Sequence, residues 1–572
     1  MSNASLELGG GNWAAKDNGD GTGSLLGYAV GDTSGKYLPR EFTFSRGADI
    51  AATRVNKDGL IEKYRENLLT YSNQFDTTWT TTNISLTSGQ SGHDGSNDAW
   101  LAQGNGLGTS RLQHGGLDWS NSVYTLSFYA KAGTESVVNV FDGTWSGVIG
   151  ATYDLSTGTA TQYPISIPVV EVTMVSVGNG WWRCSFTAIP NERTNTSGFV
   201  RIGIGSTTAA NSGNIYIQDA QLEYGLVATD YLESGSTTGK AGVLDNLPRI
   251  DYTSGSAQLL MEPSRTNYIE QSEYFNAWTK QSNVTVTDNS TTSPSGFNDA
   301  SKYSISASTN RALDQTTTLT SGVTYTFSMW VKAIVDTTIR VRSDASDWSE
   351  DISLLVSDGW KRIESTHTMG ITEYEFGFFD VSGSTGDRFY IWGAQLEAGS
   401  YATSYIPNYG TALGVTRNGD STYKNNINSI LGNTGTLFLE IEPYEVNTST
   451  SVYKKILGLF KTNGSVADAI YLEEYNGDWG VWVRKGNSTI TSTGYKSTQP
   501  TKVAVTFGVN GSRVYFDGVQ EAFTAVDTSN EMKQISTQSN AGNPVESVLK
   551  LKQLVYFPTE LTVSELTSLT TL

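Results

Sequence analysis

The stretch Ile-Tyr-Ile-Gln-Asp-Ala-Gln-Leu-Glu, residues 215–223, returns later in the chain as Phe-Tyr-Ile-Trp-Gly-Ala-Gln-Leu-Glu, residues 389–397. An Ala-Thr-x-Tyr segment follows each copy, and Tyr231 and Tyr405 keep the offset of 174 residues that separates the two stretches. A match of this length indicates a duplicated module, and internal repeats constrain a fold more strongly than any single element. The chain therefore carries one structural unit twice.

Three further pairs of segments upstream recur in the same order. They are residues 67–69 with 267–269, residues 124–132 with 325–333, and residues 180–183 with 359–362. The offset falls from 201 residues at the second pair to 179 at the third, so the second copy is 22 residues shorter between them. We call residues 66–235 module 1 and residues 266–410 module 2.

The repeated segments have the pattern of β-strands. Residues 124–130 and 325–331 alternate large apolar side chains with Thr and Ser, as a strand with one buried face does. Gly, Ser, Asn and Asp fill the gaps between such segments, as turns require. We find no long stretch with helical periodicity in either module. The chain is therefore predicted to be all-β, with each module an antiparallel β-sandwich of jelly-roll type.

The remaining residues form three further regions. Residues 1–65 are too few and too polar to hold a core of their own, so we expect them to fold against a neighbour. Residues 236–265 connect the modules and have apolar content that predicts an ordered connector. Residues 411–572 are predicted to form a different β domain, with a hairpin at the Asp-Gly pair 517–518 and a short final helix at 562–569.

The repeated motifs also carry a family resemblance. Residues 67–69 with Phe75 and Trp79, the Gly-Trp-Trp-Arg segment 180–183, and the two Ala-Gln-Leu-Glu strands are the residues concerned. On these motifs the modules resemble the carbohydrate-binding-module-like jelly rolls of tailed-phage virion proteins, the fibres and spikes of tail or head. The last domain resembles concanavalin A-like (laminin-G-like) sandwiches, on the Tyr-Phe-Asp-Gly segment and the terminal strand and helix.

The resemblance implies an order of assembly along the chain. In that family a segment like residues 54–62 runs almost directly into one like residues 246–252, whereas module 1 separates them here. This implies that module 1 is an insertion, and that residues 40–62 pack with residues 245–265. It also implies that the N-terminal segment attaches to other virion proteins.

Two further properties of such proteins stay open. Sandwiches of this type often carry a structural Ca²⁺ between loops, and Asp and Asn are plentiful, but no loop has a fixed ligand spacing. No Ca²⁺ ligands are assigned, and no other cofactor is expected. Fibres are often homotrimers, but the chain has no coiled-coil heptads that would enforce one.

Composition and charge exclude several classes of partner. The net charge of −19 argues against nucleic acid and against an anionic membrane surface, both of which require clusters of Lys and Arg. The single cysteine, Cys184, permits neither an intrachain disulfide nor a cysteine-based zinc site. No apolar run approaches the roughly 18 residues of a membrane span, and residues 1–20 lack the apolar run of a signal peptide. We expect a protein made in the host cytoplasm, released by lysis, and located in the virion.

The sequence contains little that indicates catalysis. His93, His114 and His367 have no acidic or cysteine partners at metal-binding or catalytic spacing. The glycine-rich segment 104–108 lies between β segments, without the helix that a phosphate loop needs. We therefore expect a protein that is not an enzyme. Because two carboxylates suffice for glycoside hydrolysis, a glycan-degrading spike remains the enzymatic alternative.

Tryptophans beside acidic residues are the candidate glycan contacts. Trp145 with Asp142 and Trp348 with Asp347 lie between corresponding strands of the two modules; each is a candidate sugar-stacking residue or a half-buried strand-end Trp. Trp479 and Trp482 are three apart on one strand and must face opposite sides, so one is buried and the other exposed. Trp479 completes the candidate set. Recurring tryptophans are expected in the core; these are Trp79, Trp181, Trp278 and Trp360.

These observations predict a modular structural protein of a tailed-phage virion, a tail fibre or spike. Its β modules would bind host surface glycans weakly, and several modules and copies would raise the avidity. A head fibre or capsid decoration protein with incidental glycan binding is the first alternative, and the glycan-degrading tail spike is the second.

Overall fold

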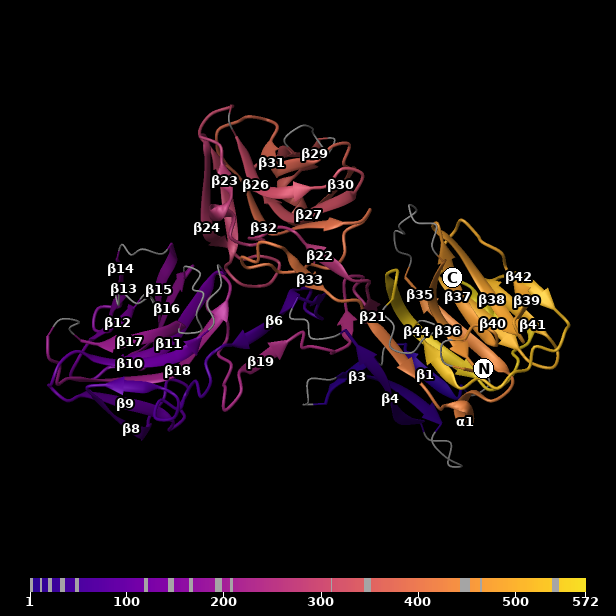
Figure 1. Ribbon diagram of the computed structural model, residues 1–572, viewed down its shortest axis with the longest axis horizontal. Helices are drawn as coiled ribbons and strands as arrows, with labels where there is room; N and C mark the ends of the chain where they lie inside the picture. Colours follow the sequence, from indigo (N-terminus) through magenta and orange to yellow (C-terminus); the bar gives the residue numbers. More distant parts are fainter. Residues whose placement is uncertain are drawn as a thin grey trace.

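The computed structural model describes residues 4–10, 13–18, 23–30, 37–46, 51–117, 122–141, 149–163, 168–190, 198–205, 209–309, 311–343, 351–442, 453–462, 465–537 and 545–572. Three lobes make up the molecule: module 1, module 2 and a terminal sandwich that holds both chain ends (Figure 1). Strands dominate all three lobes. The described residues include two short α-helices, α1 (Asn428–Leu431) and α2 (Val563–Thr570), and none of the described helices is long and apolar enough to cross a membrane.

Module 1 is a sandwich of two six-stranded antiparallel sheets. In spatial order the first sheet consists of β14 (Thr159–Gln162), β13 (Ile149–Asp154), β12 (Val137–Phe141), β17 (Gly198–Ile204), β10 (Ser110–Leu117) and β7 (Thr80–Thr82). The second consists of β15 (Val169–Gly178), β16 (Trp181–Ala188), β11 (Tyr124–Ala132), β18 (Asn214–Tyr224), β9 (Ala99–Gly104) and β8 (Ile84–Gln90). Their inner faces share one apolar core that includes Phe128 and Ile202.

Module 2 repeats this plan with two five-stranded sheets. The first consists of β23 (Thr279–Lys280), β26 (Ala312–Leu319), β31 (Glu373–Asp380), β28 (Thr337–Ser343) and β29 (Ile352–Leu354). The second consists of β24 (Val284–Thr291), β25 (Ala300–Ile305), β32 (Gly386–Ala398), β27 (Thr324–Ala333) and β30 (Trp360–Thr368). Strands β14 and β15 have no counterpart here, and they account for the longer stretch of module 1. The predicted all-β sandwich fold is confirmed.

A buried asparagine closes each module. Asn67 Nδ2 donates to the carbonyls of Ala220 (3.1 Å) and Leu232 (2.9 Å), and its Oδ1 accepts from the N–H groups of Leu69 (3.2 Å) and Leu222 (3.1 Å). Three of the bonds join the segment that enters module 1 to the last strand and to the segment that leaves it, and the bond from Leu69 fixes the entering segment itself.

Asn267 makes the same four bonds in module 2. Its Nδ2 donates to the carbonyls of Ala394 (3.2 Å) and Ile406 (2.8 Å), and its Oδ1 accepts from the N–H groups of Ile269 and Leu396, both at 3.0 Å. Both asparagines are fully buried. The repeated Asn-apolar-apolar motif is therefore a structural clasp.

The Gln and Glu of the repeated Ala-Gln-Leu-Glu strand extend this clasp. Gln221 Nε2 donates to Glu223 Oε1 (2.6 Å), and Glu223 Oε1 accepts from the Thr229 N–H (2.9 Å). Gln395, Glu397 and Thr403 make the equivalent bonds in module 2. Since a strand alternates its faces, the Ala and Leu between these polar residues point into the core. The motif is conserved between the copies because it satisfies buried polar groups.

The segments between the modules and the terminal sandwich, which include β5 (Thr53–Val55), β6 (Ile61–Asn67), β19 (Gly239–Gly242) and the connector, form what we call the central region. Each module is joined to it through a pair of adjacent strands. Module 1 starts at β6 and ends before β19, which pairs antiparallel with β6. Strand β5 completes that small sheet. Module 2 starts at β22 (Arg265–Asn267) and ends before β33 (Val415–Arg417), which also pair.

The terminal sandwich is assembled from three separate segments of the chain. The first supplies β1 (Leu6–Gly9), β2 (Ala14–Asp17), β3 (Gly23–Val30) and β4 (Tyr37–Ser45), and the connector supplies β20 (Arg249–Asp251) and β21 (Gln258–Met261). The third supplies β34 (Ser421–Lys424), β35 (Gly435–Ile441), β36 (Tyr453–Phe460), β37 (Ala469–Tyr475), β38 (Asp478–Lys485), β39 (Ser488–Ser492), β40 (Lys502–Phe507), β41 (Ser512–Phe516), β42 (Val519–Thr524), β43 (Gln534–Ser536) and β44 (Leu549–Phe557).

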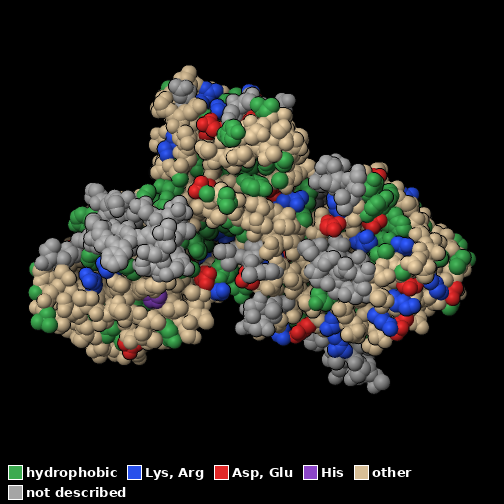
Figure 2. Space-filling model, viewed as in Figure 1, with side chains coloured by type: hydrophobic (Ala, Val, Ile, Leu, Met, Phe, Trp, Pro, Cys, Tyr) green, Lys and Arg blue, Asp and Glu red, His purple; other side chains and the backbone are tan. Residues whose placement is uncertain are grey.

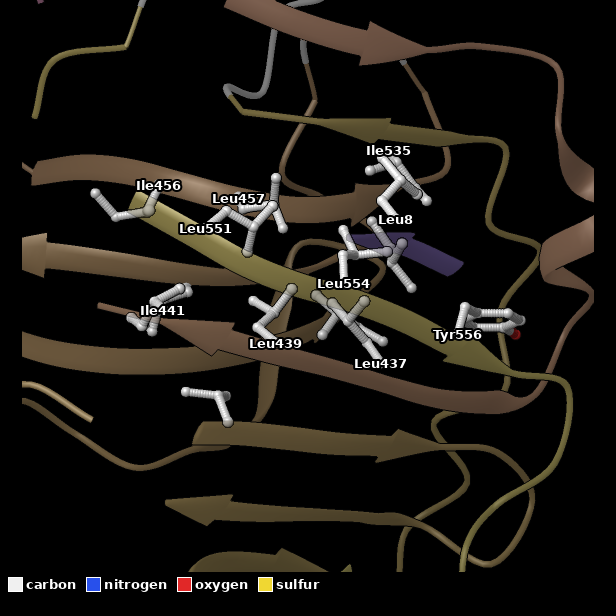
Figure 3. Packing of buried hydrophobic residues seen from close by; sticks show 14 of the residues in the cluster. Leu8, Leu437, Leu439, Ile441, Ile456, Leu457, Ile535, Leu551, Leu554 and Tyr556 are labelled. Carbon is white, nitrogen blue, oxygen red and sulfur yellow. The ribbon is translucent and has the colours of Figure 1, made fainter. Parts of the chain in front are cut away.

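The first strands are integral to this sandwich, so the structure differs from the expected division into an N-terminal segment (1–65) and a separate last domain (411–572). β1 pairs with β44, so that Leu8 lies opposite Leu554. Leu8 points into the same core as Leu437 (Figure 3). Pairing covers an edge of β44 that would otherwise expose unpaired backbone groups. Whether residues 1–65 also contact other virion proteins remains a prediction.

Ion pairs buried between the segments hold the central region together. Glu262 accepts from Arg249 Nη1 (2.7 Å) and lies 3.0 Å from Arg417 Nη1; Asp420 pairs with Arg249 and with Arg46 Nη1 (3.3 Å). Burial alone would raise the pKa of Glu262, but the two guanidinium groups outweigh it and hold that pKa well below its usual range. The network remains ionised and fixes the central region at neutral pH.

The structure also brings residues 40–62 and 245–265 into contact. The Val55 N–H donates to Asp251 Oδ2 (2.8 Å), and the Arg46 N–H donates to Asn246 Oδ1 (2.8 Å). The Tyr252 N–H donates to the Val55 carbonyl (3.0 Å). The connector is therefore a packed part of the molecule, and it forms one wall of the site described next.

Candidate functional site

A cavity of about 490 Å³ lies between module 2 and the central region. Its lining comes from residues 53–61, from the connector, and from module 2, which contributes β27, β30 and the loops at 293–294 and 402–405; Lys550 of β44 completes it. The volume falls within the roughly 300–1,000 Å³ that is typical of small-ligand pockets. Module 2 contributes Trp330, Trp360, Arg362 and Tyr405 to the lining.

Two half-buried tryptophans on neighbouring strands form the aromatic wall. Trp330 on β27 and Trp360 on β30 belong to strands that pair with each other. Edge-to-face packing on Trp392 (5.5 Å between ring centroids) and Tyr405 (5.8 Å) fixes the Trp330 ring. The Trp360 Nε1–H donates to the Thr292 carbonyl (3.0 Å). Both rings are thus held in place before any ligand arrives.

Arg362 supplies charge beside these rings. Its guanidinium carbon lies 4.6 Å from the Trp330 ring centroid, and its Nη2 donates to Ser328 Oγ (2.9 Å) and to the Thr403 carbonyl (2.8 Å). Its Nε is buried and has no hydrogen-bond partner in the structure. Arg54, which pairs with Glu62 at 2.7 Å, contributes a second guanidinium to the lining.

Two ionisable groups of the lining, Glu262 and Tyr405, are not suited to proton transfer near neutral pH. The low pKa of Glu262, described above, keeps it ionised and bound to its arginines. Burial, followed by the nearby Glu273 carboxylate, raises the pKa of Tyr405 well above its ordinary value. The cavity can therefore present aromatic faces and hydrogen-bonding groups to a ligand, and these two groups favour binding over acid–base chemistry.

Module 1 uses the equivalent face differently. Tyr129 takes the place of Trp330, and the His93 ring stacks on it with centroids 3.5 Å apart and planes at 7°. His93 Nε2 lies 2.9 Å from Asp219 Oδ2. Trp181, which corresponds to Trp360, is only 1% exposed. The imidazole therefore covers the ring whose counterpart in module 2 faces the cavity.

The structure tests one of the residues proposed from the sequence. Asp142, Trp145, Asp347 and Trp348 lie outside the described residues. Trp479 is 2% exposed and packs within the core of the terminal sandwich, so neither face of its ring is open to a sugar. Trp482, three residues further along β38, faces the other side and is half-buried, as the alternation of a strand requires.

The sequence analysis missed the residues that line the cavity. Trp360 was expected in the core with Trp79, Trp181 and Trp278, and those three are indeed buried whereas Trp360 is not. Trp330 occupies one of the positions that the alternation of residues 325–331 predicts to face away from the core, and this pattern could have indicated a tryptophan outside the core. In the described part of the chain, no group of three or more His, Cys, Asp or Glu side chains is placed to hold a metal ion.

Comparisons with known proteins add little. No family model and no curated protein matches the chain. Solved structures with some likeness include the CBM22-1–CBM22-2 tandem domain of Paenibacillus barcinonensis Xyn10C, with 14% identity, a TM-score of 0.21, and coverage of 62% of this chain and 100% of that one.

Two further structures contain CBM51 domains. The M60 catalytic domain of Clostridium perfringens ZmpB with CBM51-1 and CBM51-2 shares 10% identity, with a TM-score of 0.18 and coverage of 67% of this chain and 49% of that one. The tandem CBM51 modules of Sp3GH98, the family 98 glycoside hydrolase of Streptococcus pneumoniae SP3-BS71, share 10% identity, with a TM-score of 0.17 and coverage of 62% and 99%. TM-scores this low carry no inference about function.

Proposed function

We propose that this protein is a structural component of a tailed-phage virion, a tail fibre or spike, and that it binds host surface glycans through the cavity of module 2. The observation that carries the binding proposal is the pair of fixed tryptophans beside the Arg362 guanidinium, in a cavity of about 490 Å³. The phage assignment rests on the sequence resemblance of the modules to virion jelly rolls.

The chemistry of the lining suits a sugar. A pyranose ring offers a face of C–H groups that can stack on an indole, and hydroxyls that need both donors and acceptors. Trp330 and Trp360 provide aromatic faces, and Arg54 and Arg362 provide donors. Because the rings and the guanidinium are already held by protein contacts, binding requires little ordering of side chains.

Substitution of the stacking residue tests glycan binding. In the full-length protein, Trp330→Ala should weaken binding to polysaccharide extracted from the host surface by at least about tenfold, or about 1.4 kcal/mol, measured by isothermal titration calorimetry. Tyr129→Ala changes the corresponding residue of module 1, which His93 covers, and serves as the matched control. Equal affinity of the Trp330 variant and the unaltered protein would remove the cavity as the binding site.

Two simple observations separate this proposal from its alternatives. Immunogold labelling of particles should place the protein on the tail; labelling of the capsid would identify a head fibre or a decoration protein. Incubation with host polysaccharide should release no reducing ends. Their release would identify a glycan-degrading spike, for which two carboxylates on a common cleft would be needed.

A further inference from the structure

We propose a second glycan-binding site on the outer face of the terminal sandwich, formed by an aromatic platform of Tyr453, Tyr475, Trp482 and Tyr495. Its ligand class, an uncharged oligosaccharide, rests on the function proposed above, but the site lies on another lobe and shares no residue with the cavity of module 2. The sequence analysis selected Trp479 from this region, whereas the structure places the half-buried Trp482 on the opposite side of the same strand, next to tyrosines from neighbouring segments.

The platform is a continuous row of four rings. Tyr453 and Tyr475 are stacked, with ring centroids 4.4 Å apart and planes at 19°. Tyr475 lies 5.4 Å from Tyr495, and Tyr495 lies 4.8 Å from Trp482. Tyr453 is 56% exposed, and the other three are half-buried. The row therefore presents ring faces and edges to solvent.

Strand geometry explains why these rings share one face. Tyr453 of β36 pairs directly with Tyr475 of β37, and Trp482 of β38 pairs with Tyr471 of β37. Tyr471 and Tyr475 are four residues apart, so both side chains lie on the same side of β37. Ile470 and Leu472, which flank Tyr471, point into the core, as does Trp479 of β38. The four rings thus lie on the side of the sheet that faces away from this core.

A glycine makes room for the largest ring. Gly480 stands opposite Glu473 on the neighbouring strand, and a Cβ atom at this position would collide with the six-membered ring of Trp482. The bare backbone at Gly480 therefore lets the indole lie along the sheet, where Tyr495 packs on it. Trp482 is held in this pose by its neighbours, as a pre-organised stacking surface requires.

Polar groups beside the rings match an uncharged ligand. Glu473 accepts a hydrogen bond from the Tyr495 hydroxyl (2.9 Å) and lies 3.6 Å from Lys455 Nζ. One negative and one positive group thus stand together, so this surface has donors and acceptors but no excess charge for a polyanion or a polycation. Burial and the bond to Glu473 raise the pKa of Tyr495, so its hydroxyl stays protonated at neutral pH.

An oligosaccharide fits this surface better than a second copy of the chain does. Stable protein interfaces have an apolar, well-packed centre. Here charged side chains, such as Glu473 and Lys455, lie directly beside the rings. Charged side chains of both signs are spread over the terminal sandwich (Figure 2). Stacking of sugar rings on an open aromatic row needs only C–H faces and a few hydrogen bonds at the rim.

The test uses the full-length protein and three neutral probes: cellohexaose, maltohexaose and hexa-N-acetylchitohexaose. We expect at least one to bind with millimolar or better affinity in calorimetry and to change tryptophan fluorescence. Tyr453→Ala and Tyr475→Ala should each weaken that binding at least about fivefold. Tyr163→Ala removes an exposed tyrosine of module 1 and is the matched control.

The outcomes separate the two sites. Loss of hexasaccharide binding in Tyr453→Ala, with binding retained in Trp330→Ala, supports the platform whatever the fate of the cavity. No binding of any probe at about 10 mM, or unchanged affinity in both tyrosine variants, would overturn it. Concentration-dependent self-association in sedimentation velocity that Tyr453→Ala abolishes would also overturn it, because the face would then belong to a second copy.

Discussion

The two modules share ten equivalent strands and the same buried clasp, yet they use one face in opposite ways. In module 2 this face packs against the central region and borders the cavity, with Ile61 of β6 lying against Trp392 and Tyr405. In module 1 the corresponding face is closed by the His93 ring over Tyr129. A duplicated scaffold has therefore kept its core and diverged where its sheet meets other surfaces.

Few substitutions account for this divergence. Gln218 and Asp219 of module 1 stand where module 2 has Trp392 and Gly393, and both Asp219 (φ 52°) and Gly393 (φ 64°) have left-handed backbone at the same bulge. Since the left-handed conformation tolerates Asp but favours Gly, the bulge survives either residue. The backbone at this bulge is thus the same in both modules, whereas the side chains differ: module 1 has a closed polar cluster at this face and module 2 has an aromatic wall.

The largest expected effect tests what the modules share. Asn67→Ala and Asn267→Ala each remove four buried hydrogen bonds, so each should lower the free energy of unfolding of its own module by about 4 kcal/mol. Hydrogen–deuterium exchange followed by mass spectrometry would report each lobe separately. Asn298→Ala, at an exposed residue, should have little effect. A loss confined to one of the two asparagine variants would show that the clasp is not equivalent in the two modules.

A smaller effect is expected for the contact that only module 2 makes. Lys63 Nζ lies 2.9 Å from Glu273 and 3.6 Å from Asp299, all nearly buried. Burial alone would lower the pKa of Lys63, but these carboxylates outweigh it and raise that pKa. Lys63→Met leaves buried carboxylates unpaired, which should cost about 3 kcal/mol and speed exchange in module 2 and in β6.

The design of the Lys63 experiment includes two controls. Lys16→Met breaks an exposed pair with Glu41 and should change stability by less than about 1 kcal/mol. Burial raises the pKa of Glu273, so acidification should protonate this carboxylate more readily than an ordinary one and partly restore the stability of the Lys63 variant. Module 1 has Asn73 at the position of Glu273, so Lys63 should stabilise the docking of module 2 alone. An equal loss of stability in both modules would contradict this role of Lys63.

The two modules could be predicted from the sequence because the motifs that define them are local and occur twice. The Ala-Gln-Leu-Glu strands located equivalent positions, and the 22-residue difference corresponds to β14 and β15. The helix predicted at 562–569 is present at Val563–Thr570, where Thr562 and Glu565 form a capping box. The turn at Asp517 and Gly518 also joins two strands as predicted. Each of these features depends on residues close together in the sequence.

Two features could not be predicted from local sequence: which distant strands pair, and how far equivalent side chains of the two modules are covered by other residues. β1 is four residues long, and nothing within it specifies pairing with β44, some 550 positions away. Trp360 and Trp181 occupy one repeat position, but the loop before β9 carries His93 where the equivalent loop before β25 carries Pro294, and the two positions have unequal exposure. The candidate site therefore depends on what packs over each module, which the repeat does not encode.

The smallest expected effect concerns the closed cluster of module 1. Burial raises the pKa of Asp219 from its ordinary value of about 4 to about 6, although the bond from His93 opposes this. A carboxyl whose folded pKa is raised contributes stability that is fully present below about pH 4 and is lost as the pH rises through about 6. Asp219 should therefore cost module 1 about 1–2 kcal/mol of unfolding free energy across that range, and module 2, with Gly393 at this position, lacks this contribution.

Asp219→Asn isolates this titration. Asparagine keeps the shape of the side chain and tolerates the left-handed backbone at this position, but it cannot ionise. Urea titrations of the full-length protein at pH 4, 5, 6 and 7, followed by hydrogen exchange in each lobe, should show the decline in module 1 of the unaltered protein and a flatter profile in the variant. An unchanged slope in the variant would assign the pH dependence to another group, and the closed face of module 1 would then be pH-independent like its counterpart.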